Sequence, residues 1–356
     1  MTALLSFWLV IFFTLLFHHN KQLTRSLTLL IIFFIVFLFD FFLKNLPDQA
    51  ALKNLYDLLR ISDFGYPLYN TPDIGMSGLE SAFATKLILF NNFFSYQFTH
   101  SLTAALLAYA MLYVIGLLVE DKYFSIISIF FISIYFINYV LISQRFGIII
   151  FFNMLSIHLI QKKKYALGFL SSASAHLFHF AGIILIPLYF IYLIFQKFRN
   201  IYLFLISFFI LLIIFLVIIF DVNILNLISE SVFIKVGYFK KNESLSLLYI
   251  IFFLLFFLFG LHRLEYSQIF SLNSPFLGVL FILLLIPFYN YGTLVGRLFA
   301  LFTTIPFIFS IRNILKNIDN NFRKINFIYP IFGFFSFLFY YRLIQNKYYL
   351  QWAAFE

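Results

Sequence analysis

The stretch LFLISFFILLIIFLVIIF, residues 203–220, decides the class of fold that this sequence can adopt. It is a continuous apolar run close to the length of about 20 residues that an α-helix needs to cross a bilayer. The whole chain of 356 residues is 63% hydrophobic and 11% charged, whereas soluble domains are roughly 45–50% apolar and about 25% charged. The apolar runs are continuous rather than alternating, so they predict helices instead of the strands of a closed barrel. The sequence therefore predicts an all-α, polytopic integral membrane protein.

Runs of this kind recur along the chain and predict about twelve transmembrane helices in a single domain, residues 1–356. The runs are 3–17, 26–43, 98–119, 123–142, 146–160, 166–180, 181–195, 201–220, 247–261, 276–290, 298–311 and 325–343. Several are short for a full crossing, and residues 166–195 are also compatible with one bent hairpin.

The distribution of Lys and Arg predicts the orientation of the helices. Six short loops (HHNKQLTR, EDK, QKKK, QKFRN, HRLEYSQ and RNILKNIDNNFRK) hold 13 basic and 4 acidic residues, and the rest of the chain holds 11 basic and 10 acidic residues. Short cytoplasmic loops carry the excess of basic residues, so these six are predicted to be cytoplasmic. The two longer segments on the other side, 44–97 and 221–246, are then predicted to form an extracytoplasmic cap.

Four basic or titratable side chains are predicted to approach the outer face. Arg145 lies in the short turn SQRFG and Arg297 in YNYGTLVGRLF, while SSASAHLFHF, residues 171–180, holds His176 and His179. A single arginine at the end of a span is more often an interfacial anchor. The two histidines are three residues apart, which predicts that both rings share one face of a helix. No carboxylate or third histidine lies near them in sequence, so no metal site is predicted.

The order of these segments resembles that of the EpsG-like and Wzy-type polysaccharide polymerases of bacterial surface-glycan assembly. The resemblance rests on ISQRFGIII (142–150), the basic turn QKKKY (161–165), ASAHLFHFAGIILIPLY (173–189) and GRLFALF (296–302). His179 takes the position of the histidine of that family, and Arg145 and Arg297 take the positions of its two arginines. Asp48, in PDQAALKNLY, stands near the family's outer-loop aspartate, although the glycine of that motif is missing.

The resemblance implies a fold and a reaction. The fold would resemble that of the GT-C-type membrane glycosyltransferases. The protein would be a glycan (O-antigen) polymerase of the bacterial inner membrane that takes part in lipopolysaccharide biosynthesis. It would transfer a growing polysaccharide from undecaprenyl diphosphate onto a lipid-linked repeat unit at the periplasmic face. The transfer would be inverting and metal-independent, with no cofactor. Its partners would be membrane lipid and a Wzz-type chain-length regulator. It would not bind nucleic acid.

The residues suit this chemistry. Arginine binds phosphate oxygens bidentately and keeps its charge, so Arg145 and Arg297, with His176, are predicted to bind the departing diphosphate. His179 is the first candidate for the general base that activates the acceptor hydroxyl. Alternatively, His179 contacts the diphosphate and a carboxylate of an outer segment acts as the base; the candidates are Asp48, Asp73, Glu80 and Glu230.

Two other classes of protein remain open from the sequence. A flippase or transporter of lipid-linked oligosaccharides also has about twelve spans. The low glycine content (13 residues) and the lack of paired Gly/Pro-interrupted spans in related halves count against it. An O-antigen ligase would perform the same chemistry on a different acceptor.

Overall fold

The computed structural model describes residues 22–42, 86, 89–90, 93–198, 247–262, 264, 266–269, 271–285 and 292–319. Within these ranges every regular element is helical and there is no strand. The predicted all-α class is therefore confirmed for this part of the chain.

The elements follow the predicted apolar runs closely. In chain order they are α2 (Gln22–Phe42), α5 (Tyr96–Leu118), α6 (Asp121–Phe131), η4 (Ile132–Ile142), α7 (Gln144–Gln161), α8 (Tyr165–Ser174), η5 (Ala175–Leu177), η6 (Phe180–Ile184), α9 (Leu185–Phe198), α12 (Leu247–Leu261), α13 (Tyr266–Ile269), α14 (Phe276–Leu285) and α15 (Gly292–Asp319). The element η4 is a π-helix that continues α6, and η5 and η6 are short 3₁₀-helices.

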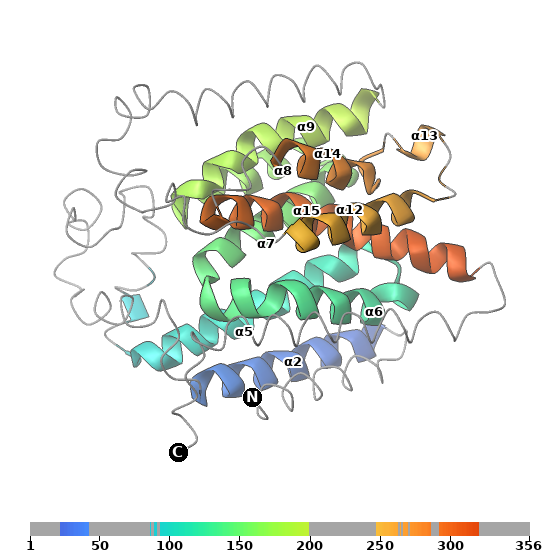
Figure 1. Ribbon diagram of the computed structural model, residues 1–356. Helices are drawn as coiled ribbons and strands as arrows, with labels where there is room; N and C mark the ends of the chain where they lie inside the picture. The colour runs from blue at the N-terminus through green and yellow to red at the C-terminus, as the bar shows by residue number, and fades with distance from the viewer. Residues whose placement is uncertain are drawn as a thin grey trace, which may run out of the picture.

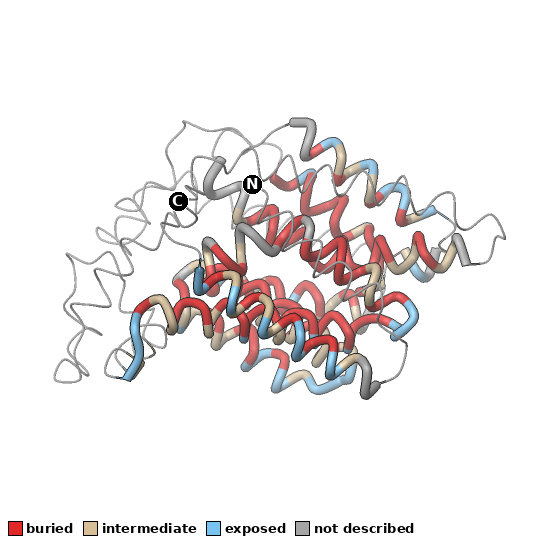
Figure 2. The backbone as a smooth tube through the Cα atoms, turned by 90° about the horizontal axis from the view of Figure 1, so that it is seen from below, coloured by how far each residue is buried: buried red, intermediate tan, exposed pale blue. Residues whose placement is uncertain are grey.

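The long helices lie side by side with their axes running in a common direction (Figure 1). Helix α2 packs on α5, and α5 packs on α7. On its other sides α7 contacts α8, α9 and α15, while α12 and α14 pack on α15. Buried positions are concentrated where the helices face one another (Figure 2). Helices α7 and α15 therefore lie inside the bundle and carry two of the predicted site arginines.

Three helices are long and apolar enough to cross a membrane: Arg25–Phe42, Tyr96–Leu118 and Arg297–Asn317. Three shorter apolar helices, Ala181–Gln196, Ile250–Leu261 and Phe276–Leu285, accompany them. Helix α2 also exposes large apolar side chains such as Leu27, Phe34 and Leu38, as expected for a surface that faces lipid. The structure is that of a helical membrane protein. The predicted runs 3–17, 201–220 and 325–343 lie outside the described residues, so the total of twelve helices stays a prediction.

The continuous helix predicted for residues 166–180 is wrong. Helix α8 ends at Ser174, and the chain reaches α9 through η5 and η6. The hydroxyl group of Tyr189 in α9 donates to the main-chain carbonyl of Tyr165 at the start of α8, at 3.0 Å. Residues 166–195 thus form the bent hairpin that was the alternative prediction.

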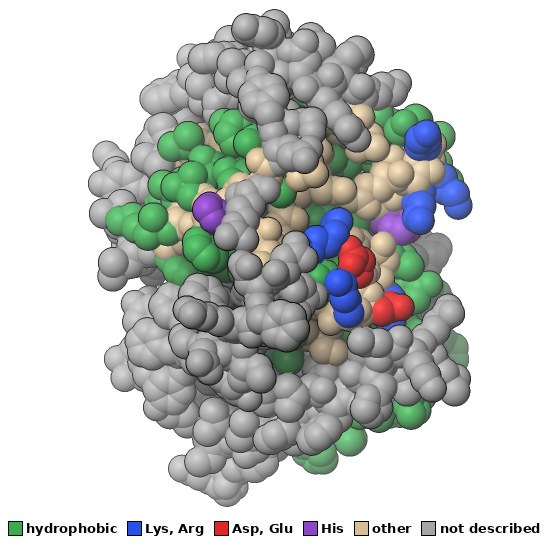
Figure 3. Space-filling model, turned by 90° about the vertical axis from the view of Figure 1, so that its right-hand side faces the viewer, with side chains coloured by type: hydrophobic (Ala, Val, Ile, Leu, Met, Phe, Trp, Pro, Cys, Tyr) green, Lys and Arg blue, Asp and Glu red, His purple; other side chains and the backbone are tan. Residues whose placement is uncertain are grey.

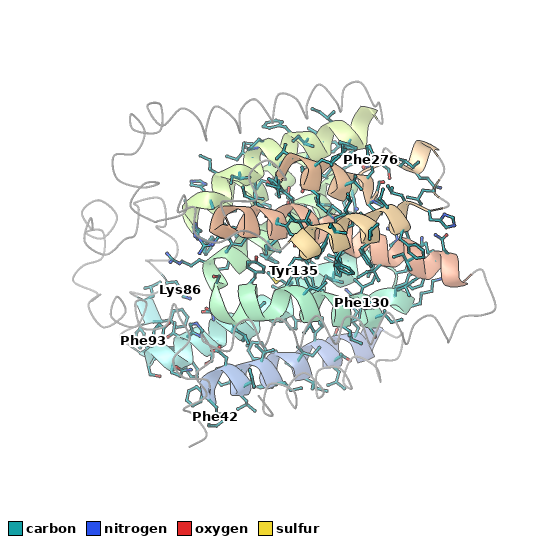
Figure 4. All side chains as sticks on the ribbon, viewed as in Figure 1. Phe42, Lys86, Phe93, Phe130, Tyr135 and Phe276 are labelled. Carbon is teal, nitrogen blue, oxygen red and sulfur yellow. The ribbon has the colours of Figure 1, made fainter. Side chains whose placement is uncertain are left out.

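The two ends of the bundle differ in their charges. At one end, called here the charged end, Arg25 pairs with Asp121 at 3.1 Å and Lys316 pairs with Glu120 at 2.5 Å. Acidic and basic side chains gather on the face that looks toward this end (Figure 3). These residues belong to the loops predicted to be cytoplasmic and to the helix ends that adjoin them. The opposite end, where α2 ends and α5 and α7 begin, is called the site end; Phe42, Lys86 and Phe93 lie there, away from Phe276 (Figure 4).

Candidate active site

The site is built around the break in the helix at SSASAHLFHF. His179 has an extended backbone, with φ −161° and ψ 135°, and is the N-cap residue of η6. The chain then folds back so closely that a Cβ atom on Gly182 would lie 2.4 Å from the main-chain carbonyl carbon of Ala175. Because main-chain atoms cannot move aside cheaply, only glycine fits at this position. Gly182 therefore allows the break, and the break places His179 inside the bundle.

Small polar residues fix the break against α7. The hydroxyl group of Ser172 donates to that of Ser156 at 2.9 Å, and Ser156 donates to the main-chain carbonyl of Gly168 at 3.0 Å. Ser171 donates to the main-chain carbonyl of Phe152 at 3.2 Å. Serine and glycine allow close approach of membrane helices and supply hydrogen bonds between them. The position of His179 is therefore set by α7, on which α8 rests.

Three of the sequence-predicted residues come together here. Phe146, which follows Arg145 at the start of α7, meets the His179 ring edge-to-face with 6.3 Å between ring centroids. The guanidinium carbon of Arg297, in α15, lies 6.0 Å from the centroid of the same Phe146 ring. Both guanidinium groups are close enough to act electrostatically on His179. Arg145, His179 and Arg297, called here the basic triad, thus converge from three elements that are far apart in sequence.

The surroundings of His179 favour its neutral form. The residue is buried, with 3% of its surface exposed, and a neutral ring is less costly to bury than a charged one. Its Nδ1 atom accepts a hydrogen bond from the main-chain N–H of Ala181 at 3.2 Å. A neutral imidazole that accepts at Nδ1 carries its hydrogen on Nε2. The triad can therefore offer two guanidinium groups and one imidazole N–H to an anion.

His176 does not share a helical face with His179, so that expectation is wrong. The helix breaks between the two residues, and the Nδ1 atom of His176 contacts the main-chain carbonyl of Ala173 within its own turn. The segment 221–246 lies outside the described residues, as do the predicted carboxylates Asp48, Asp73, Glu80 and Glu230. Among the described residues, no three His, Asp or Glu side chains gather as metal ligands. The metal-independent reaction stays a prediction.

The sequence reasoning missed a buried polar cluster beside the triad. Asp40 of α2 and His100 of α5 meet with 2.8 Å between Oδ2 and Nδ1. The side-chain amide of Gln144, which precedes Arg145, donates to the main-chain carbonyl of His100 at 3.1 Å. Asp40 is the lone acidic residue in the apolar run 26–43. An ionisable residue inside a membrane helix is by default a candidate functional residue, and that signal could have found it.

The fold and the basic triad define a helical membrane protein with a cationic site, two half-buried arginines around a buried histidine, at one end of its bundle. The model of the EpsG family matches residues 55–355, most of the chain, and the chain belongs to this family. No curated protein and no solved structure matches it. The predicted family resemblance is confirmed, and membership of this family indicates a glycosyltransferase-like membrane enzyme.

Proposed function

We propose that this protein polymerises a surface polysaccharide at the periplasmic face of the bacterial inner membrane. It transfers a growing glycan from undecaprenyl diphosphate onto the terminal sugar of a lipid-linked repeat unit. The observation that carries the proposal is the convergence of Arg145, His179 and Arg297 at the site end of a chain of the EpsG family. The positive-inside distribution of Lys and Arg supports the periplasmic placement of this end.

The chemistry of the triad suits a diphosphate leaving group. In one displacement, the acceptor oxygen bonds to the anomeric carbon while the bond from that carbon to the phosphate oxygen breaks. The electron pair leaves with the diphosphate, and the configuration at the anomeric carbon inverts. Arg145 and Arg297 neutralise the charge that develops, and the Nε2–H group of His179 donates to a phosphate oxygen. One preorganised donor of this kind is worth roughly 10²–10³ in rate. The guanidinium groups supply the positive charge, so the proposed reaction is metal-independent.

The gel pattern of surface glycan tests the proposal in a deletion strain that carries single variants. Arg145→Ala or Arg297→Ala should leave single repeat units on the lipid A core and no longer polymer. The matched control is Arg312→Ala, which removes a guanidinium group of the charged end, where Nε of Arg312 lies 4.0 Å from Glu120. This variant should leave the polymer ladder intact. Full-length polymer from both site variants would show that the triad is not needed for polymerisation.

The same gel separates the other two candidate functions. A flippase defect would remove even the single-unit product, because no repeat unit would reach the outer face. A ligase defect would leave long polymer on undecaprenyl diphosphate and none on the lipid A core. The chain-length regulator stays a proposed partner, to be tested by co-purification with this protein.

A further inference from the structure

A buried carboxylate–imidazole pair lies beside the basic triad, and the reaction as described above does not use it. The side chains of Asp40 and His100 are 0% and 3% exposed. The side-chain amide of Gln97 donates to the main-chain carbonyl of Asp40 at 2.7 Å, which holds the end of α2 against α5. Within the described part of the chain, the buried Oδ1 atom of Asp40 has no hydrogen-bond partner. Buried polar atoms almost always have partners, so this atom indicates a place for a ligand beside the pair.

The hydrogen bonds give the two buried histidines opposite tautomers. An ionised carboxylate can only accept, so the hydrogen on Nδ1 of His100 points to Asp40 Oδ2, at 2.8 Å. The Nε2 atom of His100 then carries a lone pair and can accept a proton. In His179 the Nδ1 atom accepts from the Ala181 N–H group, so its Nε2 atom is a donor. His179 therefore suits a phosphate oxygen, whereas His100 suits a hydroxyl group that must lose its proton.

The start of α7 joins the pair to the triad. Gln144 contacts His100 through the main-chain carbonyl, at 3.1 Å, and lies 3.2 Å from Nδ1. Arg145 is the next residue, and consecutive helical residues point in different directions. Gly147 allows the start of α7 to pack closely, because a Cβ atom there would clash with the main-chain carbonyl oxygen of Tyr139 in η4 and would crowd the side chain of Leu107 in α5. A substrate bound at the start of α7 would thus have the guanidinium groups of Arg145 and Arg297 on one side and the imidazole of His100 on another.

We propose that His100, held by Asp40, is the general base that takes the proton of the acceptor hydroxyl group; this rests on the function proposed above. The hydroxyl oxygen bonds to the anomeric carbon, and its proton moves to Nε2 of His100. The bond from the anomeric carbon to the diphosphate breaks, and its electron pair leaves with the diphosphate. Asp40 stays ionised and balances the positive charge of the imidazolium. The proton then passes to water before the next cycle.

Other titratable groups near His100 set the design of the test. The ring centroid of Tyr96 lies 5.7 Å from that of His100. Lys86 donates to the hydroxyl group of Thr103, about one turn further along α5, at 2.7 Å. Burial lowers the pKa of Lys86 to about 7, so Lys86 titrates in the same range as an imidazole. The pH dependence of the rate can be assigned to His100 only if a variant of Lys86 is measured in the same way, because either group could cause it.

The test uses full-length purified protein and undecaprenyl-diphosphate-linked repeat units extracted from cells that lack it. The initial rate of polymer formation is measured against substrate concentration between about pH 5.5 and 9. For the wild-type protein we expect kcat to fall at low pH, as the base becomes protonated. His100→Gln should lower kcat by roughly 10²–10⁴, change KM little and abolish the fall at low pH. Lys86→Gln should retain the decrease of kcat at low pH.

A second variant and a binding measurement separate catalysis from folding and positioning. Asp40→Asn keeps an oxygen acceptor for Nδ1 but removes the charge; it should bind undecaprenyl diphosphate like the wild-type protein and polymerise more slowly. The proposal is overturned if Asp40→Asn keeps the wild-type rate, or if Lys86→Gln loses the fall at low pH. It is also overturned if His100→Gln loses binding of undecaprenyl diphosphate together with activity, which would mark His100 as a positioning residue. Absence of polymer from the wild-type protein would instead overturn the proposed function, and this inference with it.

Discussion

The two ends of the bundle use charge in opposite ways. At the charged end, Arg25, Glu120, Asp121 and Lys316 form ion pairs, and Glu120 and Asp121 are 45% and 52% exposed. Exposed pairs of this kind are worth roughly 0–1 kcal/mol each. At the site end, by contrast, Asp40 is fully buried, and Arg145 and Arg297 are half-buried.

This difference shows that the charged groups that are poorly compensated, and therefore cost stability, lie at the site end. Asp40 is fully buried, and one of its oxygens has no partner within the described residues. The two guanidinium groups of the triad lie near the same buried imidazole, that of His179. Buried charges are costly unless they are well compensated. The ion pairs of the charged end therefore contribute little to stability, whereas the site end holds the poorly compensated buried charge expected of a functional site.

The largest effect on stability is expected from Gly182→Ala, which places a Cβ atom 2.4 Å from a main-chain carbon of Ala175. Because the clash is with backbone, it should cost about 3 kcal/mol and remove polymer. The matched control is Gly168→Ala, where the nearest atom, Cε2 of Tyr189, is 3.3 Å away and belongs to a side chain. That variant should cost less than about 1 kcal/mol. Equilibrium unfolding in detergent micelles measures both, and equal costs would mean that the break does not depend on Gly182.

A smaller effect on stability is expected from removing one acidic side chain at each end of the bundle. Asp40→Ala leaves the buried Nδ1–H group of His100 without its acceptor and should cost about 1–3 kcal/mol. Asp121→Ala removes a half-exposed partner of Arg25 and should cost less than about 1 kcal/mol. The same unfolding measurement compares the two variants. If Asp121→Ala were the more harmful of the two, the contrast between the ends would be wrong.

The smallest effect is a dependence of stability on pH at the charged end. The hydrogen bond from Lys316, with the positive charges of Arg312 and Lys122, holds the pKa of Glu120 below its usual value of 4.5 and more than offsets the effect of burial. A lowered pKa in the folded state means that this stabilisation is present above pH 4.5 and is lost as the pH falls through the lowered value. The loss should be less than about 1 kcal/mol, because the group is exposed.

The difference in stability between the wild-type protein and Glu120→Gln measures this contribution at each pH. It should be largest near neutral pH and disappear in acid. A difference that grows as the pH falls would have the opposite sign and would contradict the assignment.

The sequence predicted the helices well, because an apolar run of sufficient length has few alternatives in a membrane. Residues 123–142 were predicted as one span, and α6 with η4 covers 121–142. The π-helical form of η4 depends on how it packs, which no local pattern shows. The sequence allows a bent hairpin over residues 166–195 but does not place its break after Ser174, for a similar reason. The cause of the break is the close approach of Gly182 to Ala175, and a glycine in an apolar run is equally compatible with an unbroken helix.

The candidate site was predicted in part. Arg145, His179 and Arg297 were expected on one face from the orientation of the loops, and the structure brings them together. The spacing of a regular helix predicts that His176 shares their face, but the helix ends at Ser174, before His176. Asp40 and His100 are 60 residues apart and each is isolated in its own apolar run. Neither spacing nor periodicity connects two such residues, so only the packing of α2 on α5 reveals the pair.

The central claim is that the basic triad binds a lipid diphosphate, and the affinity of the purified protein for undecaprenyl diphosphate tests it most directly. A hydrogen bond to a charged group contributes about 1.5–3 kcal/mol, so Arg145→Ala and Arg297→Ala should each weaken binding roughly 10- to 100-fold. Arg312→Ala should leave the affinity unchanged. Equal affinity in all three variants and the wild-type protein would contradict the claim.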